Sequence, residues 1–444
     1  MIPQRILLYY PFKTKERLDY IATHLLTGIL GAEISITDSK SDFLTYSGPA
    51  INYSAEALAH GLHICPEGLL EEAGIQPRNN IEVSEWKELP CFFPCKKGDI
   101  PFDLFAASFY LLSRYEEYTS SKIDIHGRFD PVESLAYRNH FLEIPIIDRW
   151  AYVLKEELCL RYLDLTFPLR RFRFISTFDI DFPYQYQRKG LLKSVGALVK
   201  DAMRLNLKQV VERIIVHLSL KSDPYMKAIH RIEGFHQEMN KEYFLFILRG
   251  ARGKYGRSTS LPLTDYYQYL KTLKTVVLGL HPSYETYKNL ELLIREKQEL
   301  EDILGREVAS SRQHFLRISI PETFQELTIA GIRSDFSLAY AGMPGFRAGT
   351  AIPHRFYDLE KEQASDLFLY PTILMDTTLI RHWGLSPESA LVKIKSLIDE
   401  CFQSGGDYVS LWHNSNLAGK QKGNPWIDVF TDSSRYASAL EKNT

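Results

Sequence analysis

The stretch Phe172-Arg-Phe-Ile-Ser-Thr-Phe-Asp-Ile-Asp-Phe-Pro183 is the strongest indicator of fold in this chain. It is a β-branched and aromatic run, typical of a buried strand, and it ends abruptly in two acids, Asp179 and Asp181. Further short apolar runs follow, separated by long amphipathic patterns. The runs are 243–248, 275–280, 315–319, 367–370 and 408–412, and the predicted helices are 225–240, 262–273, 288–304, 321–330, 386–404 and 432–441. This alternation predicts parallel strands joined by crossover helices.

The chain before residue 166 has a different pattern. A strand is predicted over 5–10 and helices over 17–30 and 101–118, which indicates a smaller α/β domain. No hydrolytic constellation is visible in it, and His126 is interpreted as a surface loop residue. We therefore predict an α/β accessory domain over 1–165 and a β/α barrel over 166–444, with an active site at the carboxyl ends of the barrel strands.

Composition restricts the function classes. The 444 residues carry a formal net charge of −2, which gives no reason to expect a nucleic-acid partner. The N-terminus lacks the pattern of a secretory signal, and no apolar stretch is long enough to span a bilayer. Five scattered cysteines favour reduced thiols. These observations predict a cytoplasmic protein.

Residues suited to metal chemistry follow the apolar runs. Asp179 and Asp181, separated by one residue at a strand end, can divide the tasks of accepting a proton and binding a metal. His281 comes where the 275–280 strand should stop, and a neutral imidazole is a good zinc ligand.

Two later motifs complete the set. In Ser311-Arg-Gln-His314, Arg312 can clamp a carboxylate and His314 can be a ligand or a polar contact. In Leu411-Trp-His413, the histidine closes another apolar run and is a natural general acid.

The order of these motifs resembles that of the polysaccharide deacetylase family of carbohydrate esterases, and the resemblance covers 170–444. The whole chain, including 105–118 and 345–349, also resembles a Bacteroidetes-type bacterial subgroup whose N-terminal domain has no assigned function. The resemblance implies a distorted (β/α) barrel and a hydrolase that uses Zn²⁺ or another divalent metal. Its reaction would remove N-acetyl groups from an amino sugar of a bacterial glycan or glycan precursor.

Carried over by position, Asp179 is similar to the family's catalytic base, Arg312 to the arginine that holds the base, and His413 to the general acid. Asp181 and His281 match metal ligands. The sequence departs from the family at Glu285, where a second metal-binding histidine is usual. His314 from the neighbouring strand would restore an Asp-His-His set, and Glu285 is the alternative ligand.

Other candidates lie around these motifs. We expect Arg347, Asp335 and Trp412 to contact the substrate, and Asp376 to orient His413. A plain loop clamp, with Arg347 paired to an acid, is an equal alternative for Arg347. Two other function classes stay open. The missing second histidine is consistent with a non-catalytic carbohydrate-binding protein, and two acids could serve a glycosidase if they flanked a sugar.

The segment 188–221 is rich in Lys and Arg, and Asp201 and Glu212 are its only acids. Its apolar residues are spaced as on helices. Such a segment can pack on the barrel wall with a solvated basic face, or it can lie on the anionic inner face of a membrane.

Overall fold

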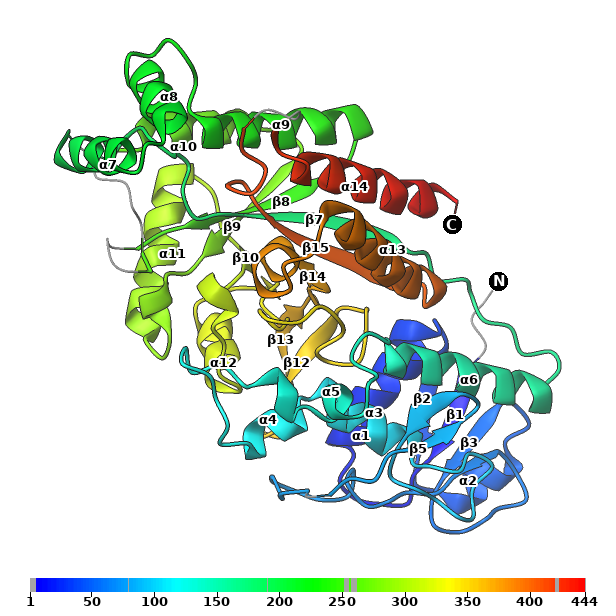
Figure 1. Cartoon of the computed structure of the whole chain (residues 1–444). Helices are drawn as coiled ribbons and strands as arrows, with labels where there is room; N and C mark the ends of the chain where they lie inside the picture. The colour runs from blue at the N-terminus through cyan, green and yellow to red at the C-terminus, as the bar shows by residue number, and fades with distance from the viewer. Residues whose placement is uncertain are drawn as a thin grey trace.

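The computed structural model describes residues 5–78, 80–189, 191–250, 255–256, 262–419 and 423–443, and the side chains of 191–193 and 208 lie outside this description. The strands form a four-stranded sheet, a nine-stranded sheet and a two-stranded hairpin. Helices pack around both larger sheets, and Figure 1 shows the two sheets at different ends of the molecule. The predicted mixed α/β class is confirmed.

The N-terminal sheet has the order β2-β1-β3-β4, and all its strands are parallel. Its strands are β1 (Arg5–Tyr9), β2 (Glu33–Thr37), β3 (Ala50–Tyr53) and β4 (Leu62–Ile64), and β5 (Ser84–Trp86) pairs separately with β6 (Leu89–Cys91). The helices are α1 (Glu16–Ala22), continuing as η1 (Thr23–Ile29), α2 (Lys40–Thr45), α3 (Leu104–Leu112), α4 (Tyr115–Thr119), η2 (Pro131–Glu133), α5 (Leu135–Arg138) and α6 (Ile146–Arg161). The strand and helices predicted here are confirmed, although the second helix is divided at Arg114.

The larger sheet has the order β12-β13-β11-β10-β9-β8-β7-β15-β14. Its strands are β7 (Arg173–Ile180), β8 (Tyr243–Leu248), β9 (Val276–His281), β10 (Ser310–Ser311), β11 (Ser334–Asp335), β12 (His354–Asp358), β13 (Gln363–Leu369), β14 (Leu374–Met375) and β15 (Asp407–His413). Only β12 and β13 pair antiparallel among these strands.

Most predicted helices are present with ends shifted by a few residues. They are α9 (Pro224–Met239), α10 (Thr264–Thr272), α11 (Leu290–Leu304), α12 (Glu322–Ile329), α13 (Pro387–Gln403) and α14 (Trp426–Lys442), and α7 (Leu191–Met203) and α8 (Leu207–His217) lie in the basic segment. Three short helical turns are η3 (Tyr284–Thr286), η4 (His314–Leu316) and η5 (Thr378–His382).

Two expectations for this sheet need correction. The pairings between described residues run from β12 to β14, and none of them closes the sheet, so a barrel is not shown. The strand predicted over 315–319 is wrong, because the extended segment is Ser310–Ser311 and the chain then turns. Phe315 and Leu316 both have positive φ, 64° and 51°, which an extended strand does not allow.

The strand register positions the functional side chains. Asp179 of β7 pairs with His413 of β15, and His281 of β9 pairs with Leu248 of β8. Because these strands are parallel, their carboxyl ends meet at one edge of the sheet. The buried side chains of Phe178 and Ile180 alternate with Asp179, so the same strand faces the core and the site.

A buried ion-pair network joins α4 to the region after β11. The Nε and Nη2 atoms of Arg347 donate to Glu117 at 2.9 and 2.5 Å, and its Nη1 donates to the carbonyl of Ala339 at 2.8 Å. Arg114 also donates to Glu117, at 2.8 Å. Arg347 and Glu117 are almost fully buried. Of the two expectations for Arg347, the structure shows the clamp paired to an acid, since its guanidinium is bonded to Glu117 in this structural junction.

Replacing Arg347 with Ala leaves the Glu117 carboxylate buried with one cation fewer. We expect the free energy of unfolding, measured by urea denaturation, to fall by about 3–5 kcal/mol. Burial raises the pKa of Glu117, but Arg347 and Arg114 outweigh it and lower that pKa. The stabilisation is therefore present above the ordinary pKa of Glu and is lost as the pH falls below it.

Arg333→Ala is the matched control, because Arg333 pairs with Glu307 on the surface with both side chains more than half exposed. Its effect on unfolding should be much smaller. Equal destabilisation by the two variants would contradict the role assigned to the junction.

Candidate active site and metal centre

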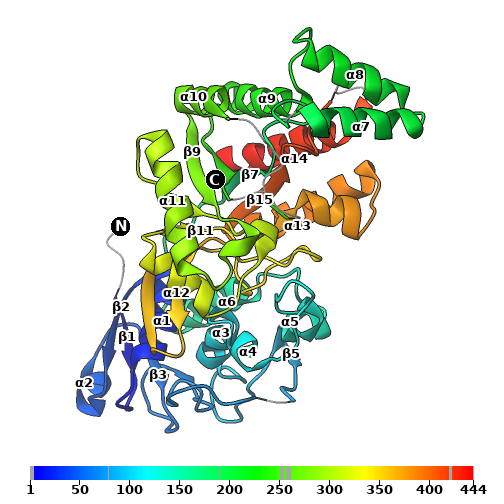
Figure 2. The ribbon, with the colours of Figure 1, turned by 90° about the vertical axis from the view of Figure 1, so that its left-hand side faces the viewer.

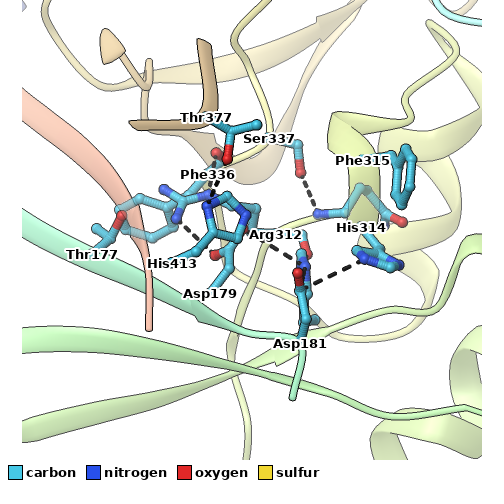
Figure 3. A network of polar contacts seen from close by, with 12 residues as sticks. Thr177, Asp179, Asp181, Arg312, His314, Phe315, Phe336, Ser337, Thr377 and His413 are labelled. Atoms are coloured by element: carbon cyan, nitrogen blue, oxygen red, sulfur yellow. Dashed lines mark hydrogen bonds and ion pairs between the residues drawn. The ribbon is translucent and has the colours of Figure 1, made fainter. Parts of the chain in front are cut away.

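Asp181, His281 and His314 converge on one point. Asp181 follows β7, His281 ends β9, and His314 follows β10, and their potential ligand atoms all lie within 4.8 Å of one another. His281 Nε2 is 3.3 Å and His314 Nε2 is 3.6 Å from Asp181 Oδ1. Figure 3 shows Asp181 and His314 facing each other across this point.

The chemistry of the cluster fits a divalent cation. Asp181 Oδ1 and His281 Nε2 are buried and have no hydrogen-bond partner within the described part of the chain. His281 Nδ1 bonds to the carbonyl oxygen of Arg312, which leaves the lone pair of Nε2 facing the cluster. One carboxylate and two imidazoles form a typical zinc ligand set.

The electrostatics agree with this fit. Burial lowers the pKa of His314 to about 4, so this imidazole is neutral at pH 7. Burial also lowers the pKa of His281, but Asp179 and Asp181 outweigh it and raise that pKa. A divalent cation would take the place of the proton that these carboxylates otherwise attract to His281.

Glu285, the alternative ligand, lies in η3 with its side chain exposed and outside the cluster. The chain turns at Ser283, whose backbone is extended, so Glu285 is not one helical turn from His281. The position of Glu285 does not support it as a ligand.

Asp179 borders the cluster and is held by Arg312. Arg312 Nη1 donates to Asp179 Oδ1 at 3.0 Å, while Asp179 Oδ2 lies 3.6 Å from His281 Nε2. The guanidinium is completely buried and also donates to Thr372 Oγ1 and to the carbonyl of Phe336, both at 3.0 Å (Figure 3). One oxygen of Asp179 is therefore fixed, and the other is directed toward the cluster.

His413 is oriented by Asp376, as the sequence predicted. Its Nδ1 lies 2.7 Å from Asp376 Oδ1, and its backbone N–H donates to Asp376 Oδ2 at 2.8 Å. Burial lowers the pKa of His413, but Asp376 foremost, with Asp181 and Asp179, raises it to about 10. At neutral pH, His413 is a protonated imidazole beside the cluster.

These groups open into one cavity of about 520 Å³. It is lined by Asp179, Asp181, His281, His314 and His413, and also by Phe182, Tyr225, Phe315, Thr377, Arg381, His382 and Asn416. A cavity of this size accommodates a small ligand such as a sugar residue.

The N-terminal region adds two residues that the sequence did not indicate. His126 and Arg128 line the cavity, so His126, a half-buried residue of a turn, also belongs to a wall of the site. Arg128 Nη1 donates to the carbonyl of Phe315 at 2.6 Å, and Arg317 Nε donates to that of His126 at 2.6 Å. No local motif marks these residues, because the contacts that join them to the site are with residues far away in sequence.

Two predicted substrate contacts lie outside the cavity. Asp335 is completely buried and accepts hydrogen bonds from the hydroxyls of Ser311 and Ser337 at 2.7 and 2.9 Å. Trp412 points to the other side of β15 and packs against Phe430. Alternate residues of a strand face opposite sides of the sheet, so Trp412 faces away from the cavity that His413 lines. Asp335 and Trp412 therefore stabilise the walls of the cavity.

Comparisons with known proteins give limited information. Residues 6–163 match a family model described as a family of unknown function (DUF7033). No curated protein matches the chain.

Three solved structures cover 60–62% of this chain. A protein named as a polysaccharide deacetylase from Mycobacterium smegmatis has 13% identity, 86% of its own chain covered and a TM-score of 0.39. One named as a polysaccharide deacetylase involved in O-antigen biosynthesis, from Bordetella bronchiseptica, has 15% identity, 91% of its own chain covered and a TM-score of 0.29. The polysaccharide deacetylase Bc1974 from Bacillus cereus has 10% identity, 88% of its own chain covered and a TM-score of 0.29. At these scores the functional argument depends on the geometry of the site.

The ligand set can be tested by metal binding. We expect purified protein to hold about one zinc or similar divalent ion per chain. His314→Ala should weaken the affinity at least about 100-fold, because the loss of a ligand costs more than the loss of a residue that only orients one. The measurements are elemental analysis and competition with a chromogenic chelator.

Glu285→Ala is the control and should leave the affinity unchanged. Unaltered binding in His314→Ala would remove this ligand assignment, and a folded protein with no affinity for zinc would remove the centre.

Proposed function

We propose that the protein is a metal-dependent hydrolase that removes N-acetyl groups from an amino sugar of a bacterial glycan or glycan precursor. The observation that carries the proposal is the convergence of three functions in one cavity. The ligand set of Asp181, His281 and His314 shares one cavity with a carboxylate held by arginine, Asp179, and an imidazole held by a carboxylate, His413.

The metal ligands and the base would act on water and on the amide. A divalent cation held by Asp181, His281 and His314 would polarise the amide carbonyl and lower the pKa of a water molecule toward about 7. Asp179 Oδ2 accepts the water proton, while Oδ1 stays bonded to Arg312, which keeps the carboxylate oriented.

His413 supplies the acid. With Nδ1 bonded to Asp376, its Nε2 protonates the leaving amine, which departs poorly without a proton. The backbone N–H of His314 is already bonded to the carbonyl oxygen of Pro282. We therefore assign the backbone N–H of the next residue, Phe315, as the donor to the oxyanion. The products are acetate and a free amino sugar.

Two other functions are less well supported by these contacts. A glycosidase needs two carboxyl groups on either side of a sugar, but Asp179 and Asp181 both face Nε2 of His281. A carbohydrate-binding protein has no need for an oriented base, an oriented acid and a ligand set together. Metal-dependent turnover distinguishes the enzyme from the binding protein.

Asp179 and His413 can be tested as a base and acid pair. Asp179→Asn keeps the shape and removes the proton acceptor, and His413→Ala removes the donor. Each should lower the deacetylation rate on a panel of N-acetylated amino sugars by about 10²–10⁴-fold. The two losses should not multiply in the double variant if both residues serve one cycle.

Metal content is the control, because neither residue is assigned as a ligand, and it should be unchanged in both variants. If wild type turns over a substrate and Asp179→Asn does so equally fast, the mechanism is wrong.

The contact between Asp376 and His413 predicts a pH dependence. The pKa of His413 is raised above its ordinary value, so the protonated acid is present at neutral pH and is lost as the pH rises toward about 10. The contribution of protonated His413 to the free energy of unfolding has the same pH dependence: it is fully present below about pH 6.5 and is lost as the pH rises toward about 10. Asp376→Asn removes the main cause of the rise, so the alkaline limb of the kcat profile should move toward neutral pH. An unchanged limb, or an unchanged His413 titration by NMR, would contradict the assignment.

A further inference from the structure

Helices α7 and α8 form a hairpin inserted between β7 and α9. Figures 1 and 2 show that it extends away from the helices that cover the large sheet. Within the described residues, no helix is long and apolar enough to cross a bilayer.

The hairpin and the loops around it expose many large apolar side chains, each 42–82% accessible. They are Val195, Val199, Met203, Leu205, Leu207, Val211, Ile214, Leu218 and Leu220. In α7 they recur every four residues, and in α8 every three or four, so each set follows one side of its helix. Nine such residues in 26 positions are an unusual concentration for a surface that meets only water.

The hairpin exposes positive charges, whereas its acids contact other residues of the protein. Its two acids are engaged within the protein, since Asp201 pairs with Arg213 at 2.7 Å and Glu212 accepts from the hydroxyl of Tyr186 at 3.3 Å. Lys200, Arg204 and Lys221 are exposed and have no acidic partner among the described residues. The surface therefore combines exposed apolar residues with cations that no protein carboxylate neutralises.

We propose that this hairpin docks on the surface of an anionic lipid bilayer, with the apolar residues in the acyl boundary and Lys200, Arg204 and Lys221 at the lipid phosphates. A second copy of this chain would bring the same cations together, which disfavours it as the occupant. The proposal does not rest on the proposed enzymatic activity.

In the amino-acid sequence, the hairpin lies next to residues that line the cavity. Phe182 precedes α7 and Tyr225 follows α8, and both line the cavity. Tyr225 also lines a second hollow, together with Asn206 and Gln209 of the hairpin. Docking through α7 and α8 would therefore hold the cavity near the lipid surface; that a membrane-attached glycan would then reach the cavity rests on the proposed function.

Vesicle flotation of the full chain tests the proposal. We expect the protein to float with vesicles of phosphatidylglycerol and phosphatidylcholine at low salt, less at high salt, and little with phosphatidylcholine alone. The double variant Met203→Ser, Leu207→Ser should lower the partition coefficient about tenfold or more. Lys200→Gln with Arg204→Gln should lower it about fivefold for each charge removed.

The matched control is Leu163→Ser with Leu169→Ser, which removes two apolar side chains of similar exposure (88% and 77%) outside the hairpin. It should float like wild type. Absence of flotation at low salt, or equal flotation of the hairpin variants and wild type, would overturn the proposal. A dimer that the Met203/Leu207 variant dissociates, without lipid binding, would overturn it in favour of a second copy as the occupant.

Discussion

Complete burial of the Arg312 guanidinium is the constraint on which the geometry of the site depends. Desolvation disfavours a buried charge, and burial accordingly lowers the pKa of Arg312. An arginine nevertheless stays protonated, and the hydrogen bond from its Nη1 to Asp179 Oδ1 offsets part of the cost of burial. The ring of Phe246 lies 4.7 Å from the guanidinium carbon and excludes water from this contact. Arg312 also positions one of the proposed metal ligands, because its carbonyl oxygen holds the ring of His281. The base and one ligand are therefore positioned by a single side chain and its backbone.

The N-terminal region belongs to the same structural unit as the site. The buried Arg114–Glu117–Arg347 network ties α4 to the region after β11, and Arg128 reaches the turn that follows His314. Burial of these ion pairs is favourable only with their partners in place, so the region is unlike a module attached by a flexible linker. Residues 6–163, which match a family of unknown function, include His126 and Arg128 of the cavity wall.

The sequence predicted what depends on local periodicity. The apolar runs at β7, β8, β9 and β15 identified the strands, and those at β7, β9 and β15 end in polar residues that the structure brings together. It did not predict β10, because a strand of two residues has no periodicity to detect. Asp335 and Arg347 were placed at the substrate from their residue types, but a buried charge can equally serve packing, and only the tertiary contacts distinguish the two. His126 and Arg128 were missed for the same reason.

The acid and base differ from the third ligand in how they are held. Asp179 and His413 are paired in register on two neighbouring strands, so their separation is set by backbone hydrogen bonds of the sheet. His314 lies on a turn in which Phe315 and Leu316 adopt left-handed backbone angles that cost free energy in residues with a side chain. That turn persists because surrounding contacts hold it, and the hydrogen bond from Arg128 to the carbonyl of Phe315 is one of them. The geometry of the proposed acid and base is thus a property of the large sheet, whereas the geometry of the proposed metal ligands depends also on the N-terminal region.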